Sequence, residues 1–175
     1  MFFHSPLSRR RLILFLLDGM SATAVQKFSI ASATVDDCCE CAGLLVGQLR
    51  EHSVGASATH LARVLENVVA DAGRGFLLLA RDNSRIIGVA YVATILSAEH
   101  CGPVAWLEEL YVLPEFRSRG TGTALLTAVL ERARAAGIVA MDLEIDAGHS
   151  RAESLYRRFG FRPLKRARWV KELTT

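Results

Sequence analysis

The alternation of apolar and polar side chains predicts strands in the first half of the chain. Phe28 to Thr34 alternates apolar with small polar residues and is expected to form a first strand. Two further apolar runs, 76–80 and 86–96, are separated by Asp82-Asn83-Ser84, a combination typical of turns. The pair therefore predicts an antiparallel hairpin.

Apolar residues at helical spacing predict two helices between these strands. The first is expected to be capped by Asp36 or Asp37 and to run to about Glu51. The second opens at Ser57 or Thr59, carries its apolar residues on one side, and ends at the glycines that follow.

The region around which the rest is organised begins at Trp106. Residues 106–113 are rich in large apolar and aromatic side chains, and Pro114 ends them, as expected for a strand. A glycine-containing turn follows, then an amphipathic helix from Thr123 that Gly137 is placed to end. Residues 138–145 alternate again, so this unit predicts a right-handed parallel strand–helix–strand crossover.

The C-terminal part predicts one more helix and two short strands. The helix starts at His149 or Ser150 and runs through Phe159, and segments 161–164 and 168–173 are expected to pair antiparallel. Together these elements predict an α/β fold, in the sense of a mixed, mostly antiparallel sheet with one parallel crossover and helices on both faces.

Length and composition predict one domain with an ordinary core. The chain has 175 residues, of which 51% are hydrophobic and 22% charged. A net charge of +3 gives no argument for nucleic acid, and no apolar run is long enough for a bilayer. We therefore expect neither a nucleic-acid nor a membrane partner.

Residues 1–25 are expected to be an N-terminal extension outside a domain at 26–175. Three arginines at 9–11 precede the apolar run 12–17, which outlines a secretory signal. That run is shorter than the usual apolar region, and Asp18 closes it. The other interpretation is a misplaced start, because Met20 would begin a chain that enters the first strand directly.

The four cysteines do not predict a disulfide framework or a metal site. Cys38, Cys39 and Cys41 are crowded on a predicted helix, and no histidine stands at a familiar zinc spacing from them. They are expected to serve as small apolar residues in a reducing cytoplasm. Cys101 follows His100, but sequence neighbours often point apart, so we do not expect a nucleophilic pair.

The turn before the central helix has the chemistry of an anion site. The first N–H groups of a helix lack intrahelical partners and lie at the positive end of its dipole. Residues 117–122, Arg-Ser-Arg-Gly-Thr-Gly, place glycines and arginines there, which favours a phosphate or pyrophosphate. The spacing matches neither a P-loop nor a dinucleotide fingerprint.

Two segments resemble a known family. LEELYVLPEFRSRGTGTALL is similar to the acetyl-CoA-binding motif of the GNAT N-acetyltransferase superfamily, and HSRAESLYRRFGF, at 149–161, is similar to its later helix. The resemblance covers roughly the last two-thirds of the chain closely. It implies a GNAT fold whose two parallel strands splay apart, so that the pantetheine arm of acetyl-CoA lies in the gap.

The resemblance also implies which residues hold acetyl-CoA. The carbonyl of Leu110 would hold the pantetheine and the N–H of Val112 would polarise the thioester, while the turn would hold the pyrophosphate mostly by main chain. His149 stands where the family often has asparagine, and Arg158, like Arg151, is a candidate for a phosphate contact or a solvated face. The expected contacts are Leu110, Tyr111, Val112, Arg117, Ser118, Arg119, Gly120, Thr121, Gly122, Thr123, His149 and Arg158.

Tyr156 and Glu108 are the expected catalytic residues. Tyr156 matches the family tyrosine near the coenzyme A sulfur, where a phenol can protonate or hydrogen-bond the leaving thiolate. Glu108 is the candidate base, directly or through water, although Glu109 and water alone stay open. By strand parity Glu108 shares a face with Leu110, and adjacent carboxylates line one cleft only if a bulge intervenes.

The function implied is transfer of an acetyl group from acetyl-CoA to a primary amine of a small molecule, by direct attack in a ternary complex. The alternatives are acetylation of a protein N-terminus or lysine, or a module that binds acetyl-CoA without turnover. The sequence does not identify the acceptor amine. A homodimer is the general expectation for the assembly.

Overall fold

The computed structural model describes residues 28–51, 55–146 and 148–173. The predicted N-terminal extension therefore lies outside the described residues. In chain order the elements are β1 (Ser29–Ser32), η1 (Val35–Asp37), α1 (Cys38–Glu51), α2 (Ala58–Ala70), β2 (Gly75–Asp82), β3 (Arg85–Ser97), β4 (Gly102–Val112), η2 (Pro114–Phe116), α3 (Thr121–Ala135), β5 (Ala140–Leu143) and α4 (Ser150–Arg158).

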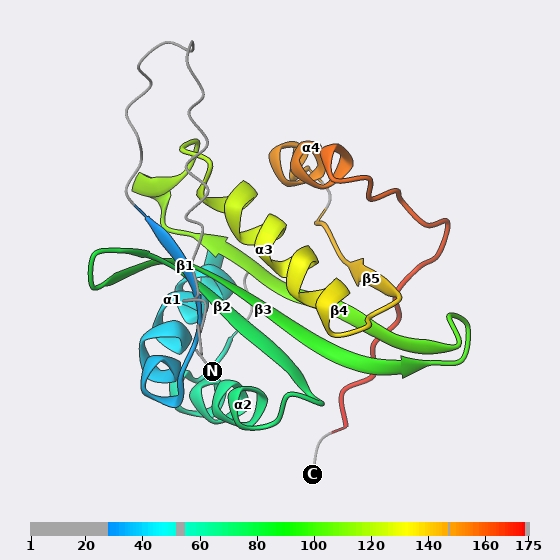
Figure 1. Ribbon diagram of the computed structural model, residues 1–175, viewed down its shortest axis with the longest axis horizontal. Coiled ribbons are helices and arrows are strands. Elements are labelled where there is room, and N and C mark those ends of the chain that lie inside the picture. Colours follow the sequence, from blue (N-terminus) through cyan, green and yellow to red (C-terminus); the bar gives the residue numbers. More distant parts are fainter. Residues whose placement is uncertain (1–27, 52–54, 147, 174–175) are drawn as a thin grey trace, which may run out of the picture.

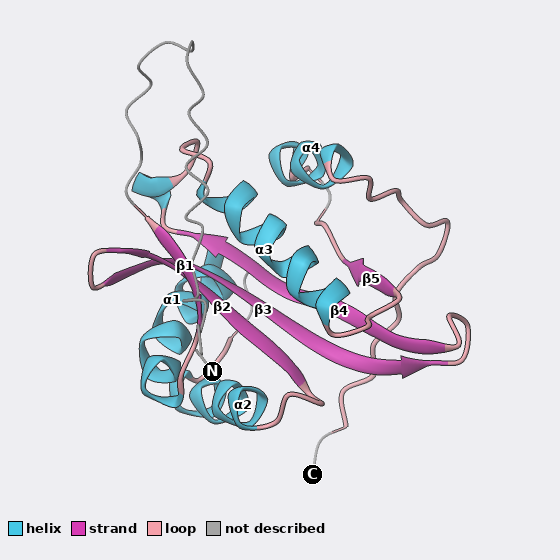
Figure 2. Ribbon diagram, viewed as in Figure 1, coloured by secondary structure: helices cyan, strands magenta, loops and turns pink. Residues whose placement is uncertain are grey.

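These strands form one mixed sheet in the order β1-β2-β3-β4-β5 (Figures 1 and 2). Strands β1 to β4 are antiparallel neighbours, and β5 pairs parallel to β4 after the connection through α3. The predicted mixed, mostly antiparallel sheet with one parallel crossover is confirmed.

Each face of the sheet is covered by helices and has its own core. On one face α3 packs across the strands, with Leu125, Leu126 and Val129 fully buried (Figure 1). On the other face α1 and α2 enclose Leu45 and Leu65. The central strands β2 and β3 are buried on both sides, which explains why their apolar runs are nearly continuous.

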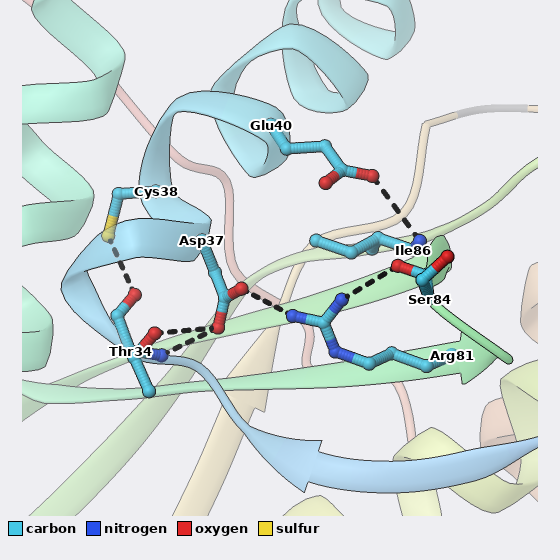
Figure 3. Close-up of polar contacts among 7 residues, drawn as sticks. All are labelled: Thr34, Asp37, Cys38, Glu40, Arg81, Ser84 and Ile86. Carbon is cyan, nitrogen blue, oxygen red and sulfur yellow. Dashed lines mark hydrogen bonds and ion pairs between the residues drawn. The ribbon is translucent and has the colours of Figure 1, made fainter.

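A polar network ties the start of α1 to the β2–β3 hairpin (Figure 3). The backbone N–H and hydroxyl of Thr34 both donate to the Asp37 carboxylate, which also pairs with the Arg81 guanidinium. Arg81 donates in addition to the Ser84 carbonyl, and Glu40 accepts from the N–H of Ile86. Asp37 thus lies inside η1 and binds backward to Thr34, rather than standing before the helix as a cap.

Gly88 on β3 allows the sheet and α3 to pack closely. A Cβ at this position would lie 2.9 Å from the Tyr111 carbonyl oxygen and 3.1 Å from a methyl of Leu125. A bulge lies beside it as well, because Ala80 pairs with Gly88 while Arg81 pairs with Ile86. Gly88 therefore combines a close approach with a neighbouring bulge, the two settings in which a strand interior favours glycine.

Several strand boundaries differ from the sequence prediction. The sequence prediction left residues 97–105 between two strands, whereas β3 ends at Ser97 and β4 already begins at Gly102, so only a turn at 98–101 separates them. Pairing extends along these two strands from Gly88↔Val112 to Ser97↔Gly102. β5 is shorter than predicted, because only Ala140–Leu143 pairs with β4.

The prediction of a final antiparallel pair was wrong. Residues 161–164 and 168–173 form neither strand nor helix, and the segment passes from α4 along the outer side of β5 (Figure 1). Exposed ion pairs hold it, one from Arg166 to Glu99 and one from Arg168 to Glu144. Phe161 still packs against the core, but the apolar side chains beyond it are exposed, and Trp169 is 91% exposed.

Candidate active site

The turn before α3 presents backbone N–H groups to solvent. Gly120 precedes the helix in the left-handed region at φ +86°, and Ser118 has φ +62°. The first helical bond runs from the N–H of Ala124 to the carbonyl of Gly120, so the three N–H groups before it lie at the helix start without an intrahelical partner. A Cβ at Gly120 would meet nothing within 4 Å, so this glycine serves the backbone angle rather than close packing.

The side chains of the turn mainly hold its shape. The Thr121 side chain is buried, and its hydroxyl donates to the Phe116 carbonyl at 3.3 Å. Arg117 donates from Nε to the Val112 carbonyl at 2.8 Å and lies over the Tyr111 ring. Arg119 lies over the Phe116 ring. An anion at this turn would therefore be held chiefly by the main chain.

Helix α4 reaches this turn through Arg151. Its guanidinium donates to Ser118 Oγ at 2.8 Å, so a cationic side chain lies beside the exposed N–H groups. Arg158 instead donates to Ser154 within its own helix. His149 precedes α4 and donates its N–H to the Asp146 carbonyl, and its side chain makes no capping bond to α4.

The second half of β4 has main-chain groups free of a strand partner on its β5 side. The last parallel pair is Leu107↔Leu143, and β4 continues to Val112. Leu113 donates its N–H to the Ile87 carbonyl on β3. Because main-chain groups alternate direction along a strand, those of Leu110 and Val112 point the opposite way, toward the side where β5 has ended.

A bulge in β4 carries the two adjacent glutamates. Tyr91 pairs with Glu109 while its neighbour Val92 pairs with Leu107, so Glu108 is an extra residue without an opposite partner. The parity that placed Glu108 with Leu110 therefore does not hold across this point. Odd-numbered Leu107 and even-numbered Leu110 both pack on the α3 face.

The two carboxylates have different surroundings. Partial burial raises the pKa of Glu108; Arg168 opposes this rise and Glu144 adds to it. Glu109 instead accepts a 2.6 Å hydrogen bond from Nε2 of Gln48 on α1. Gln48 was not predicted. The signal was present, since it is a polar residue at helical spacing after the buried Cys41 and Leu45.

Tyr156 lies buried beneath the β4 and α4 side chains. It is 9% exposed and makes an edge-on contact with Phe161, at 5.6 Å between ring centroids. Burial, with a further contribution from Glu109, raises the pKa of Tyr156 to about 12. The phenol is therefore neutral and able to donate throughout the ordinary pH range.

The described part of the chain shows neither a metal site nor a membrane-spanning helix. No group of three or more histidine, cysteine, aspartate or glutamate residues is placed there to hold a metal ion. No described helix is both long and apolar enough to cross a bilayer. All four cysteines are free thiols, and burial, followed by the nearby Cys38, raises the pKa of Cys41 to about 12.

Comparison with known proteins identifies the family. The model of the Acetyltransferase (GNAT) family matches residues 44–161, which is more than half of the chain and includes every predicted site residue. The chain belongs to the GNAT acetyltransferase family. It is accordingly an acyltransferase, and its predicted fold is the fold of this family.

Two curated relatives and one solved structure illustrate what this chain is similar to. The uncharacterized N-acetyltransferase YhfO of Bacillus subtilis is 26% identical over 117 residues, 67% of this chain and 78% of that protein. An L-methionine sulfoximine/L-methionine sulfone acetyltransferase of Pseudomonas aeruginosa is 42% identical over 52 residues, which is 30% of each chain. A solved structure described as a predicted acetyltransferase of Clostridium acetobutylicum with acetyl-CoA has a TM-score of 0.71 at 18% identity, covering 83% of this chain and 96% of that one.

Proposed function

We propose that this GNAT protein is an acetyl-CoA-dependent N-acetyltransferase that acetylates a primary amine of a small molecule by direct attack in a ternary complex. The observation that carries the proposal is the adjacency of two features. N–H groups without an intrahelical partner at the start of α3 suit a diphosphate. The main chain of β4 at Leu110 and Val112, which has no β5 partner, precedes them in the chain.

The residues present fit acetyl-CoA, which would supply the acetyl group as a thioester. Residues 117–123 would bind the pyrophosphate, chiefly through the N–H groups that follow Arg117, because the N–H of Arg117 itself donates to the Pro114 carbonyl. The Ser118 and Arg151 side chains lie beside them. The Leu110 carbonyl and the Val112 N–H would hold the pantetheine arm and polarise the thioester carbonyl. His149 and Arg158, at the two ends of α4, are proposed as further cofactor contacts.

Glu108 is the proposed base for the acceptor amine. An ammonium of ordinary pKa ~10.4 has no lone pair for attack, so it must lose a proton, directly or through water, to a carboxylate. Burial raises the pKa of Glu108, which strengthens it as a base. The nitrogen then forms its bond to the acetyl carbon, the bond from that carbon to sulfur breaks, and the second proton lost by the nitrogen goes to the leaving thiolate through solvent.

Tyr156 is proposed to stabilise the thiolate that leaves. With its pKa raised to about 12, this phenol is a weaker acid than a thiol of ordinary pKa ~8.5, so complete proton transfer would be uphill. Donation of a hydrogen bond to the developing thiolate requires no such transfer. We therefore assign Tyr156 the role of hydrogen-bond donor.

The proposed acceptor class is a small cationic amine. Two carboxylates one residue apart give the acceptor side of β4 a negative character that attracts an ammonium. The Pseudomonas relative, by its name, acetylates amino-acid derivatives. A homodimer and a cytoplasmic location complete the proposal; the four free cysteines are compatible with a reducing compartment.

The test combines cofactor binding with turnover. Calorimetry with acetyl-CoA should give saturable heat, and free-thiol release should follow addition of an amine from a panel of 2-phenylethylamine, spermidine, L-methionine sulfone and a lysine peptide. Turnover of the peptide alone would favour a protein acetylase, and binding without thiol release would favour a non-catalytic module. No binding at all would overturn the proposal.

The pH profile tests the base. For the amine with the highest turnover, kcat/KM should fall as pH falls through the raised pKa of Glu108, because the protonated carboxyl accepts no proton. Glu108→Gln should lower kcat/KM by about 100-fold and abolish this acid limb. Retention of the limb in that variant would remove Glu108 from the mechanism.

A further inference from the structure

The contact between α1 and the central strand β4 contains a polar pair, Gln48 and Glu109. Gln48 continues the stripe of α1 that buries Cys41 and Leu45 against the sheet. Its amide Nε2 donates to Glu109 Oε2 at 2.6 Å, between residues 61 positions apart in the chain. A short bond to a carboxylate at such a junction fixes the position of both side chains.

The other end of the same amide is a buried acceptor. Gln48 Oε1 is shielded from solvent, and it receives no hydrogen bond from any described residue. Exchanging the amide's oxygen and nitrogen would not relieve this, because the oxygen would then face the Glu109 carboxylate. Buried acceptors in native proteins are almost always paired, so an isolated one indicates a place where an N–H group binds.

The pair lies beside the proposed reaction centre. Glu109 follows the bulge residue Glu108, on the stretch of β4 that has no β5 partner. Its carboxylate is near enough to the Tyr156 phenol to oppose its ionisation. The Gln48 amide therefore reaches, from α1, a carboxylate that follows the proposed base in the chain and acts electrostatically on the proposed thiolate donor.

We propose that Gln48 and Glu109 together bind the ammonium of the acceptor, and that Gln48 is a specificity residue for primary amines. Gln48 Oε1 accepts one N–H of the ammonium, while the Glu109 carboxylate, held in place by Gln48 Nε2, pairs with its charge. A third N–H gives its proton to Glu108, directly or through water. The inference rests on the proposed acetyl transfer and adds the group that selects the acceptor.

The experiment replaces Gln48 by methionine, which keeps its length and removes both hydrogen-bonding groups. Gln48→Met should raise KM for the best amine of the panel about tenfold, leaving the KM for acetyl-CoA unchanged. The matched control is Glu40→Met, which removes another bond from α1 to the sheet, at the Ile86 N–H, far along the helix. That control should leave both KM values within about twofold.

A double comparison tests the N–H contact itself. Methylating the nitrogen of the best amine removes one N–H, so wild type should lose kcat/KM on this derivative, and Gln48→Met should lose about tenfold less. Equal losses in the two proteins would overturn the proposal. If the methionine variant does not fold, Gln48→Leu serves in its place, since leucine already lies on the same stripe at position 45.

The outcomes separate this inference from the proposed function. Absence of acetyl-CoA binding or of turnover in wild type would refute the acetyl transfer itself. Normal turnover in wild type, with unchanged acceptor KM in Gln48→Met, would refute only the role of Gln48. A parallel loss in Gln48→Met and Glu40→Met would mean that the amide only packs α1, and would equally overturn the proposal.

Discussion

Tyr156 shows how a side chain's surroundings decide its chemistry. A tyrosine on an amphipathic helix is ordinarily an apolar residue of the core, and this one does pack edge-on against Phe161. Burial also raises its pKa to about 12, which keeps the hydroxyl protonated. A protonated phenol is a hydrogen-bond donor, and we propose that this one serves the ligand.

We expect Tyr156→Phe to lower kcat about tenfold or more, because the departing thiolate loses its hydrogen-bond donor. Binding of acetyl-CoA, followed by calorimetry, should change little. Tyr91→Phe is the matched control: Tyr91 is a partly buried phenol whose pKa burial also raises, and it pairs with Glu109 across the strands. A fully active Tyr156→Phe, or an equal loss in both variants, would contradict the assigned role.

At the scale of single residues, the sequence could indicate candidate site residues but not the contacts between residues. Tyr156 and the glycine turn were recognisable because their spacing is repeated in a family. The Gln48–Glu109 bond joins residues 61 positions apart, and no local pattern encodes such a contact. The roles of Arg117 and Arg119 in shaping their own turn were equally hidden, because a flanking arginine suits an anion as well as an aromatic ring.

At the scale of elements, α1 depends on a polar network at its start. Burial alone would raise the pKa of Asp37, but the Thr34 N–H and the Arg81 guanidinium outweigh it and hold that pKa below its ordinary value of 3.8. A carboxyl with a lowered folded-state pKa stabilises the protein above the unfolded-state pKa. This contribution is lost as pH falls below 3.8 through the folded-state value.

Asp37→Asn should therefore lower the free energy of unfolding by about 1–3 kcal/mol at pH 7, since its bonds to charged groups are lost. The difference from wild type should shrink as the pH falls below 3.8, where the wild-type carboxyl also becomes neutral. Chemical denaturation at a series of pH values measures both. Asp36→Asn is the control, because the neighbouring Asp36 is exposed, and it should change stability by less than about 0.5 kcal/mol.

Element types were predicted better than element ends. Apolar periodicity located all four α-helices of the described residues, and Ser57 and Gly137 lie at the helix ends where they were expected. The start of β4 was missed, because Gly102 and Pro103 are typical of a loop whether or not the strand continues through them. Backbone pairing, which side-chain patterns do not record, decides such boundaries.

At the scale of the whole molecule, the C-terminal segment departs most from expectation. The sequence predicted two strands in residues 161–173, yet none of these residues belongs to a strand of the described sheet. What holds the segment is exposed ion pairs and the stacking of Arg168 on Trp106. Surface pairs of this kind contribute little, ~0–1 kcal/mol each, and salt weakens them.

Tryptophan fluorescence should report this exposure. The chain has two tryptophans, and Trp169 is 91% exposed while Trp106 lies beneath Arg168. Trp169→Phe should remove most of the emission that acrylamide quenches, and should change the free energy of unfolding by less than about 0.5 kcal/mol. Trp106→Phe should keep that emission. A shielded Trp169 whose shielding grows with protein concentration would instead indicate that the segment pairs in an assembly of copies.

The extra residue in β4, Glu108, changes the face of the sheet to which each following side chain points. Before it, odd-numbered side chains such as Leu107 face α3; after it, even-numbered ones such as Leu110 do. One extra residue thus lets a single strand pack in the core along its first half and present, along its second half, the main-chain edge that we propose holds the cofactor. A substitution of Glu108 changes one side chain, whereas its deletion would turn every side chain that follows to the opposite face of the sheet.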